Sequence, residues 1–246
     1  MKTNFYKFLL LGLFIALSAF SLIQKKTTVY IIGDSTAANK AADKYPETGW
    51  GMEFQSFFKN DVKVDNRALN GRSTKSFRNE KRWEPVLDQL KAGDYVLIEF
   101  GHNDEKIDKP TVGVSIADFK NNLANYVKET RSKKAYPVLL TPISRRSFKN
   151  GVLIDSHGDY PSATRQVADS LNVPLIDMLA KTESLLNRLG DQASIKLFLH
   201  VDSGHVNYPN GKVDDTHLSP VGAKQIAGLA AQGIKELKLS LAKKLK

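Results

Sequence analysis

Two segments near opposite ends of the chain carry the residue types that acyl transfer to a serine requires. Ser35 ends the tripeptide Gly33-Asp34-Ser35, and Asp214 precedes His217 by three positions. A serine hydroxyl becomes a nucleophile when a histidine takes its proton, and a carboxylate beside that histidine fixes its tautomer. We therefore predict a catalytic triad of Ser35, Asp214 and His217. Each segment alone has a plainer interpretation: Ser35 as a helix cap in a turn, and Asp-x-x-His as a structural or metal-binding pair.

Acyl transfer also needs hydrogen-bond donors for the negative charge that develops on the carbonyl oxygen. The backbone N–H of Ser35 is one candidate. Gly71 can offer its own N–H at a place where a side chain would crowd the substrate, and Asn103 can offer its side-chain amide. The alternatives are a simple turn at Gly71 and an Asx-turn at Asn103.

These residues follow a regular alternation of strand-like and helix-like segments. Short apolar runs predict buried strands at 28–32, 62–64, 95–100, 137–140 and 173–176. Amphipathic spacing predicts helices at about 50–59, 82–90, 116–131, 161–171, 178–189 and 219–242. The alternation predicts an α/β fold in which helices cover both faces of a parallel sheet.

The predicted strands also indicate where the site forms. Ligands bind at the carboxyl ends of the strands of such a sheet. Ser35, Gly71 and Asn103 all follow predicted strands. We therefore expect these three residues to meet at one edge of the sheet.

The histidine belongs to the C-terminal part of the chain. Residues 190–216 lack clear periodicity, which predicts a loop near the site. Ser219 and Pro220 suit the start of the last helix, as a capping residue and a first helical residue. This predicts that His217 lies in the loop just before that helix.

Four blocks together resemble the SGNH (GDSL) hydrolases. They are Gly33-Asp34-Ser35, Gly71, Gly101-x-Asn103-Asp104 and Asp214-x-x-His217, in the order and spacing of that family. The resemblance implies a three-layer α/β/α sandwich with a five-stranded parallel sheet of the flavodoxin-like type. It also implies the triad Ser35, Asp214 and His217, and an oxyanion hole formed by Ser35, Gly71 and Asn103.

Further segments resemble the rhamnogalacturonan acetylesterase branch of that family. They are residues 48–51 (TGWG), 71–73 (GRS), 100–104 (FGHND), 141–146 (TPISRR) and 157–161 (HGDYP). The resemblance covers about residues 28–235. It implies a carbohydrate esterase that removes O-acetyl groups from plant cell-wall pectin, chiefly rhamnogalacturonan, without a cofactor or a metal. The alternatives are an acetylesterase on another glycan such as xylan, a general GDSL lipase or thioesterase, and a non-catalytic carbohydrate-binding protein.

Five further residues are candidates for contact with an acidic polysaccharide. Arg72 and Arg145 could pair with galacturonate carboxylates, because a guanidinium group matches a carboxylate in shape. His102, His157 and His200 could contact the sugar, with loop structure or capping as the alternative.

One cluster raises the question of a metal. His200, Asp202 and His205 lie close together in the sequence. Imidazole and carboxylate groups suit zinc, but no third certain ligand is evident. We therefore predict no metal site.

The chain begins with the pattern of an export signal. Lys2 and Lys7 are followed by an apolar run that extends to about residue 20, and small residues suit a cleavage site. We predict that residues 1–21 are a signal peptide and that 22–246 form a single hydrolase domain. The protein is then secreted or periplasmic, with an uncleaved N-terminal anchor as the alternative.

Composition narrows the class of partner. The 246 residues include no cysteine, which excludes disulfides, a thiol nucleophile and a thiolate metal site. The formal net charge of +10 could attract acidic polysaccharides, or it could merely keep a lysine-rich tail solvated. We expect a monomer that binds an acetylated acidic polysaccharide or its oligosaccharides, with no nucleic-acid partner and no membrane span in the mature chain.

Overall fold

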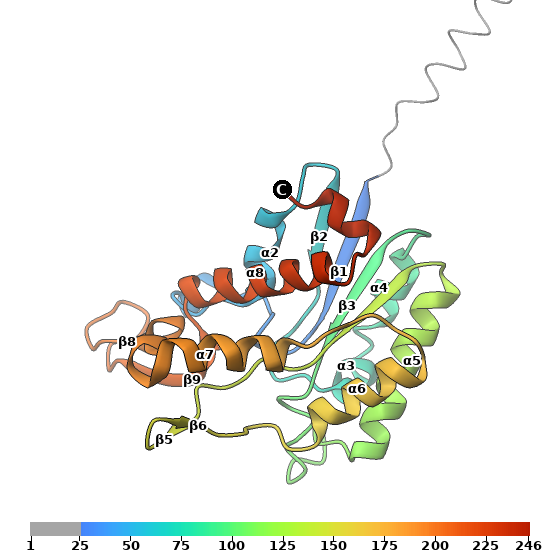
Figure 1. Ribbon diagram of the computed structural model, residues 1–246. Coiled ribbons are helices and arrows are strands. Elements are labelled where there is room, and N and C mark those ends of the chain that lie inside the picture. The colour runs from blue at the N-terminus through green and yellow to red at the C-terminus, as the bar shows by residue number, and fades with distance from the viewer. Residues whose placement is uncertain (1–25) are drawn as a thin grey trace, which may run out of the picture.

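The computed structural model describes residues 26–246, so the predicted signal peptide lies outside the described residues. A five-stranded parallel sheet forms the centre of the described chain, with the strand order β2-β1-β3-β4-β7 (Figure 1). The strands are β1 (Thr27–Gly33), β2 (Val62–Asn66), β3 (Tyr95–Glu99), β4 (Tyr136–Leu140) and β7 (Leu175–Ile176). This confirms the predicted parallel sheet, and each strand overlaps the apolar run that predicted it.

Helices lie on both faces of the sheet and complete a three-layer sandwich (Figure 1). The α-helices are α2 (Trp50–Phe54), α3 (Thr74–Asn79), α4 (Glu84–Gln89), α5 (Ile116–Ser132), α6 (Tyr160–Ser170), α7 (Met178–Ser194) and α8 (Pro220–Glu236). Short 3-10 helices are η2 (Ala42–Lys44), η3 (Gln55–Phe57), η4 (Ile195–Leu197) and η5 (Ser240–Lys244). Between residues 26 and 246, no helix combines the length and the apolar character needed to cross a membrane.

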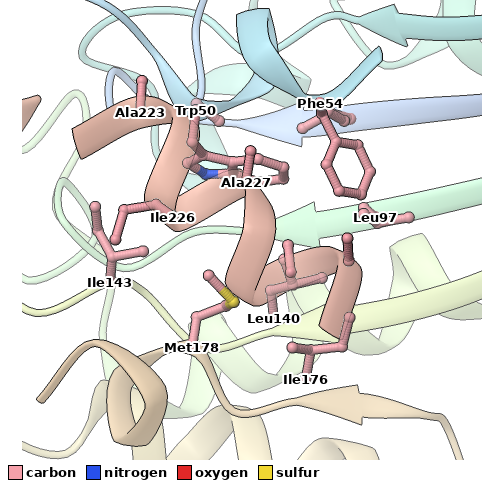
Figure 2. Packing of buried hydrophobic residues seen from close by; sticks show 14 of the residues in the cluster. Trp50, Phe54, Leu97, Leu140, Ile143, Ile176, Met178, Ala223, Ile226 and Ala227 are labelled. Carbon is pink, nitrogen blue, oxygen red and sulfur yellow. The ribbon is translucent and has the colours of Figure 1, made fainter. Parts of the chain in front are cut away.

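Successive strand residues point to opposite faces, which divides the core into two clusters. In β1, Val29 and Ile31 pack with residues of α2, α7 and α8, whereas Tyr30 and Ile32 pack with residues of α4, α5 and α6. Figure 2 shows part of the first cluster, which includes Ala227 of α8. Because both faces are covered, the central strands β1 and β3 contain continuous apolar runs, and all five residues of β3 are buried.

The segment predicted as a loop over 190–216 contains an antiparallel hairpin. Its strands are β8 (Phe198–Val201) and β9 (Lys212–Leu218). The prediction that His217 lies in a loop was therefore wrong, because His217 belongs to β9. Only Leu218 of β9 is buried, so the strand has no apolar run that would reveal it.

Smaller differences concern short or terminal elements. Helix α3 was not predicted, because Phe77 is the one large apolar residue among its six, which leaves no helical spacing to recognise. A short hairpin was also missed. Its strands, β5 (Phe148–Lys149) and β6 (Val152–Leu153), have two residues each. Helix α7 continues past its predicted end through a kink at Gly190, and the predicted helix over 219–242 ends at Glu236 before η5 begins.

Helix α8 begins where it was predicted to begin. The hydroxyl of Ser219 accepts a hydrogen bond from the backbone N–H of Gly222 at 3.1 Å, and Pro220 occupies the first turn. The helix start packs directly against η4, since a Cβ atom at Gly222 would lie 1.8 Å from the carbonyl oxygen of Leu197. This close approach fixes the end of α8 that follows His217.

We expect Gly222→Ala to lower the free energy of unfolding by at least about 2 kcal/mol, because helix α8 must move away from η4. Gly228→Ala is the matched control on the same helix, where the new Cβ would meet only the Phe57 ring at 3.5 Å. It should raise stability by up to about 1 kcal/mol through helix propensity. Urea unfolding of both variants measures the difference, and equal stabilities would contradict the packing argument.

Candidate active site

The carboxyl end of β1 and the hairpin strand β9 bring Ser35, Asp214 and His217 together. The Nε2 atom of His217 lies 2.9 Å from Ser35 Oγ, and its Nδ1 atom lies 2.8 Å from Asp214 Oδ2. An ionised carboxylate can only accept, so Nδ1 carries the proton and Nε2 accepts from the serine hydroxyl. A histidine held in this way can take the serine proton.

A bulge in β9 makes this row of hydrogen bonds possible. In a regular strand, residues three positions apart point to opposite faces. Two neighbouring residues of β8 pair with Asp214 and Leu218, so residues 215–217 are left out of the register. Inside the bulge, Asp214 Oδ1 accepts from two backbone N–H groups, one of them that of His217 at 2.9 Å. The bulge therefore turns the imidazole back over the carboxylate.

These contacts also determine the charge of Asp214. Burial alone would raise its pKa, but the hydrogen bonds from the ring and the backbone of His217 outweigh burial and hold the pKa well below its usual range. Asp214 is therefore negative at neutral pH, and a negative carboxylate stabilises the imidazolium that forms when His217 takes a proton.

The tip of the β8–β9 hairpin is attached to the segment around η2. The side-chain amide of Asn207 donates to the carbonyl oxygens of Ala42 at 3.1 Å and Tyr45 at 2.8 Å. The hydroxyl of Tyr208 donates to the carbonyl oxygen of Lys44 at 2.9 Å. The strand that carries Asp214 is thus anchored both at α8 and at its far tip.

Ser35 lies in a tight turn directly after β1. Asp34 Oδ1 accepts from the backbone N–H of Thr36 at 3.0 Å and from its hydroxyl at 2.9 Å. The turn approaches β3 so closely that a Cβ atom at Gly33 would lie 2.5 Å from the carbonyl oxygen of Glu99. No helix of the described chain begins at Ser35, which excludes the interpretation of this serine as a helix cap.

Three hydrogen-bond donors were predicted for the carbonyl oxygen of a substrate. The backbone N–H groups of Ser35 and Gly71 have no hydrogen-bond partner within residues 26–246. Asn103 Nδ2 donates to the carbonyl oxygen of Arg72 at 3.1 Å, and its Oδ1 accepts from Lys106 Nζ at 2.7 Å. These two contacts orient the amide and leave the second Nδ2 hydrogen for a ligand. Sequence reasoning missed Lys106, since a lysine three residues after an asparagine is no recognisable signal.

The backbone conformation gives a reason for a glycine at position 71 that is independent of the predicted crowding of a substrate. A Cβ atom there would meet nothing within 4 Å, so crowding by the protein does not require glycine. The backbone of Gly71 has a φ of +77°, which L-residues with a side chain rarely adopt. The turn conformation therefore favours glycine at this position.

Buried carboxyl groups lie beneath the Ser35 turn. Burial, and next the negative charge of Asp34, raises the pKa of Glu99 to about 8, although Trp50 Nε1 donates to Glu99 Oε2 at 2.5 Å. Burial also raises the pKa of Asp34 itself, against two hydrogen bonds from Thr36. For Asp104, burial raises the pKa to about 7. The layer behind the site therefore holds protons that the unfolded chain would release.

The two arginines predicted as substrate contacts are already paired with protein carboxylates. Arg72 donates to Glu80 Oε2 through Nε at 3.0 Å and Nη2 at 2.8 Å. Arg145 donates to Glu105 Oε1 at 2.5 Å and to the carbonyl oxygen of Ser156 at 2.6 Å. Contact with a uronate would require either arginine to exchange a partner, although both side chains keep part of their surface exposed.

The three predicted histidines face different surroundings. His157 is buried, and its ring nitrogens lie 2.9 Å from Glu105 Oε2 and 2.8 Å from the carbonyl oxygen of Ile143, so it supports the fold and offers no nitrogen to a sugar. The ring of His102 is buried edge-on against that of His157, at 4.5 Å between centroids. The contacts of His157 correct the prediction that it touches the substrate directly, whereas both ring nitrogens of His102 have no hydrogen-bond partner within the described residues, so its substrate contact stays a prediction.

The third histidine, His200, belongs to the hairpin and is partly exposed. Its Nε2 atom lies 2.7 Å from Asp215 Oδ1. The ring of His205 instead lies against that of Tyr208 near the hairpin tip. Among the described residues, no group of three histidine, aspartate or glutamate side chains could hold a metal ion.

The amino-acid sequence is similar to a known protein family and to several proteins named as esterases. Residues 31–225 match the model of the GDSL-like Lipase/Acylhydrolase family. The rhamnogalacturonan acetylesterase RhgT of Bacillus subtilis is 39% identical over 222 residues, which are 89% of this chain and 94% of that protein. The probable rhamnogalacturonan acetylesterase YesY of the same organism is 34% identical, over 87% of this chain and 94% of its own length. The rhamnogalacturonan acetylesterase of Emericella nidulans is 27% identical over 87% of each.

Two solved structures share the fold. Protein YxiM of Bacillus subtilis superimposes with a TM-score of 0.75 at 25% identity, over 87% of this chain and 58% of that chain. The acetylxylan esterase Axe2 of Geobacillus stearothermophilus superimposes with a TM-score of 0.60 at 20% identity, over 85% of this chain and 96% of that chain. The three-layer architecture is therefore shared with esterase structures.

The buried carboxyl groups predict a pH dependence of stability. The ordinary pKa of a glutamate is 4.5, so between about 5 and about 8 a folded chain keeps a proton on Glu99 that the unfolded chain has lost. The free energy of unfolding should therefore fall as the pH rises through this window. Glu99→Gln should flatten that fall by up to about 1.4 kcal/mol per pH unit.

Urea unfolding at several pH values between about 5 and 8 measures this slope. Glu84→Gln, which removes an exposed carboxylate at the start of α4, is the control and should keep the wild-type slope. An unchanged slope in Glu99→Gln would show that Glu99 is ionised in the folded protein.

Proposed function

We propose that this chain, which belongs to the GDSL-like lipase/acylhydrolase family and is an esterase, removes O-acetyl groups from pectin, chiefly from rhamnogalacturonan. The observation that carries the proposal is the row of hydrogen bonds from Ser35 through His217 to Asp214. The coarser activity, that of a carbohydrate acetylesterase, follows from the relatives named rhamnogalacturonan acetylesterase.

In the first step of the proposed mechanism, Ser35 Oγ attacks the acetyl carbonyl carbon while His217 Nε2 takes the hydroxyl proton. Negative charge moves to the carbonyl oxygen. The backbone N–H groups of Ser35 and Gly71 and the amide of Asn103 donate hydrogen bonds to it. When the tetrahedral intermediate collapses, the carbon–oxygen bond to the sugar breaks and His217 gives its proton to the sugar oxygen.

In the second step, a water molecule repeats the attack on the acetyl-enzyme. His217 takes a proton from the water, and the same donors hold the oxyanion. Collapse of the second intermediate breaks the bond to Ser35 Oγ, which regains a proton from His217, and acetate leaves. Asp214 stays ionised throughout and stabilises the imidazolium in each step.

The proposal names rhamnogalacturonan as the polymer from which the acetyl groups are removed. Its support is that two relatives named as rhamnogalacturonan acetylesterases, one of them as probable, are more than 30% identical over most of both chains. The formal net charge of +10 also favours an acidic polymer over a neutral one. Xylan remains the competing polymer, since its backbone offers the same kind of acetyl ester.

The proposal includes the location and state of the protein. Residues 1–21 act as a signal peptide, and residues 22–246 work as a single hydrolase domain and a monomer in the periplasm or outside the cell. Export suits an enzyme whose polymeric substrate is too large to enter a cell. The basis of this part is the charge and apolar pattern of the first residues.

Ser35→Ala should lower acetate release by at least about 10⁴-fold, because it removes the only atom that forms the acetyl-enzyme in this mechanism. Circular dichroism and the unfolding midpoint should stay at wild-type values. Ser162→Ala, at an exposed position of α6, is the control and should retain full activity. Wild-type activity in the Ser35 variant would exclude the proposed nucleophile.

The polymer is tested by acetate release from acetylated rhamnogalacturonan, homogalacturonan and xylan at equal ester concentration. We expect rhamnogalacturonan to have the highest kcat/KM of the three. Release from xylan alone would overturn the pectin assignment and leave the esterase mechanism standing. Release of octanoate in preference to acetate would instead favour a general acyl esterase.

A further inference from the structure

Lys40 is a buried cation that the proposed mechanism does not use. Its side chain is only 2% exposed. The ammonium group lies 2.6 Å from Glu47 Oε1, 2.6 Å from the carbonyl oxygen of Ser35 and 2.8 Å from Asn70 Oδ1. An ammonium group has three hydrogens, so these three acceptors use its full hydrogen-bonding capacity.

The three acceptors belong to three different loops of the site. The carbonyl oxygen of Ser35 belongs to the turn that carries the nucleophile. Asn70 directly precedes Gly71, whose unpaired N–H is a proposed oxyanion donor. Glu47 belongs to the segment between η2 and α2. Lys40 thus connects the Ser35 turn with the Asn70–Gly71 turn. In the proposed mechanism, the backbone N–H groups of Ser35 and Gly71 donate to the same carbonyl oxygen, so these two turns must keep a fixed relative position.

The segment that carries Glu47 also contacts the strand of the triad. The backbone N–H of Thr48 donates to the carbonyl oxygen of Leu218 at 2.9 Å, one residue after His217. The next residue, Gly49, fits against the Ser35 turn so closely that a Cβ atom there would lie 2.0 Å from the carbonyl oxygen of Ala38. Glu47 is therefore held in place by its neighbours and offers Lys40 a fixed anchor.

The ammonium group of Lys40 is fully occupied by its three acceptors, so it neither acts as a base nor contacts a substrate. Burial lowers its pKa, but the hydrogen bond and charge of Glu47 act in the opposite direction and favour the charged form. A charged, fully bonded ammonium group has no lone pair to accept a proton. Its effect on the reaction must therefore come through the groups that it holds.

We infer that Lys40, anchored by Glu47, is a positioning residue that holds the Ser35 turn and the Asn70–Gly71 turn in the relative arrangement that catalysis requires. The inference rests on the proposed function of Ser35 and Gly71. A displacement of about 1 Å in a group that contacts the reacting atoms can lower the rate about 100-fold. Loss of the shared cation should therefore lower kcat without removing any group that contacts the substrate.

The principal test is the double variant Lys40→Met/Glu47→Gln, which removes both charges so that no buried carboxylate is left without a partner. We expect kcat for p-nitrophenyl acetate to fall about 10- to 100-fold, with KM changed by less than about threefold. The rate at which diethyl p-nitrophenyl phosphate labels Ser35 should fall by a similar factor, since labelling needs the same turn and donors.

A matched control comes from another lysine–glutamate pair. Lys181 Nζ lies 2.5 Å from Glu236 Oε2 and links α7 to α8, far along the chain from the Ser35 and Gly71 turns. Lys181→Met/Glu236→Gln should leave kcat and the labelling rate at wild-type values. If Lys40 only stabilises the fold, Lys40→Met/Glu47→Gln should lower the unfolding midpoint and leave kcat at 25 °C and the rate of Ser35 labelling unchanged. That result would overturn the inference.

Asn70→Ala is a second, milder variant that decides the question if the double variant does not fold. Asn70 is exposed, so the chain should fold normally while Lys40 loses its contact with the Gly71 turn. We expect a several-fold fall in kcat at an unchanged unfolding midpoint, and an unchanged kcat would contradict the inference. Wild-type protein that released no acetate from any ester would instead refute the proposed function itself.

Discussion

The carboxylate of Asp214 is the group on which the arrangement of the site depends. One oxygen accepts from the imidazole of His217, and the other accepts from two backbone N–H groups of the same bulge. The contact that orients the histidine ring and the contact that bends the strand thus share one side chain. Because each hydrogen bond also favours the ionised form, the fold and the charge of the site are set together.

Apart from β9, the residues of the proposed site lie in turns that follow the strands of the central sheet. The sheet is covered on both faces, and Ser35, Gly71 and Asn103 follow the carboxyl ends of its strands. The Ser35 turn lies against β3 with no room for a side chain at Gly33. The turn that carries Ser35, the proposed nucleophile, is therefore held by backbone packing, whereas the proposed donors at Gly71 and Asn103 depend on turn conformation and on side-chain hydrogen bonds.

The sequence was most informative where burial dictates residue type. Strand β3 was predicted because a strand buried on both faces is rich in apolar residues, and four of its five residues, Tyr95–Ile98, form an apolar run. Strand β9 was missed because most of its residues are polar and only Leu218 is buried, so it has no apolar run. The same limit applies inside the site: the sequence places His157 beside polar motifs, but only its two hydrogen bonds reveal a structural role. The anchoring of Lys40 joins residues whose proximity no local pattern records.

The long separation between Ser35 and His217 has a consequence for the life of the chain. The hydrogen bond between them joins residues 182 positions apart, and the hairpin that carries the histidine is tied to the segment around η2. Contacts of such high contact order form late, because long loops must close first. The ribosome must therefore synthesise the chain as far as residue 217 before Ser35 can meet His217. A chain that ends before residue 217 can contain all five strands of the central sheet and still lack His217, so the sheet and the site are completed at different points of synthesis.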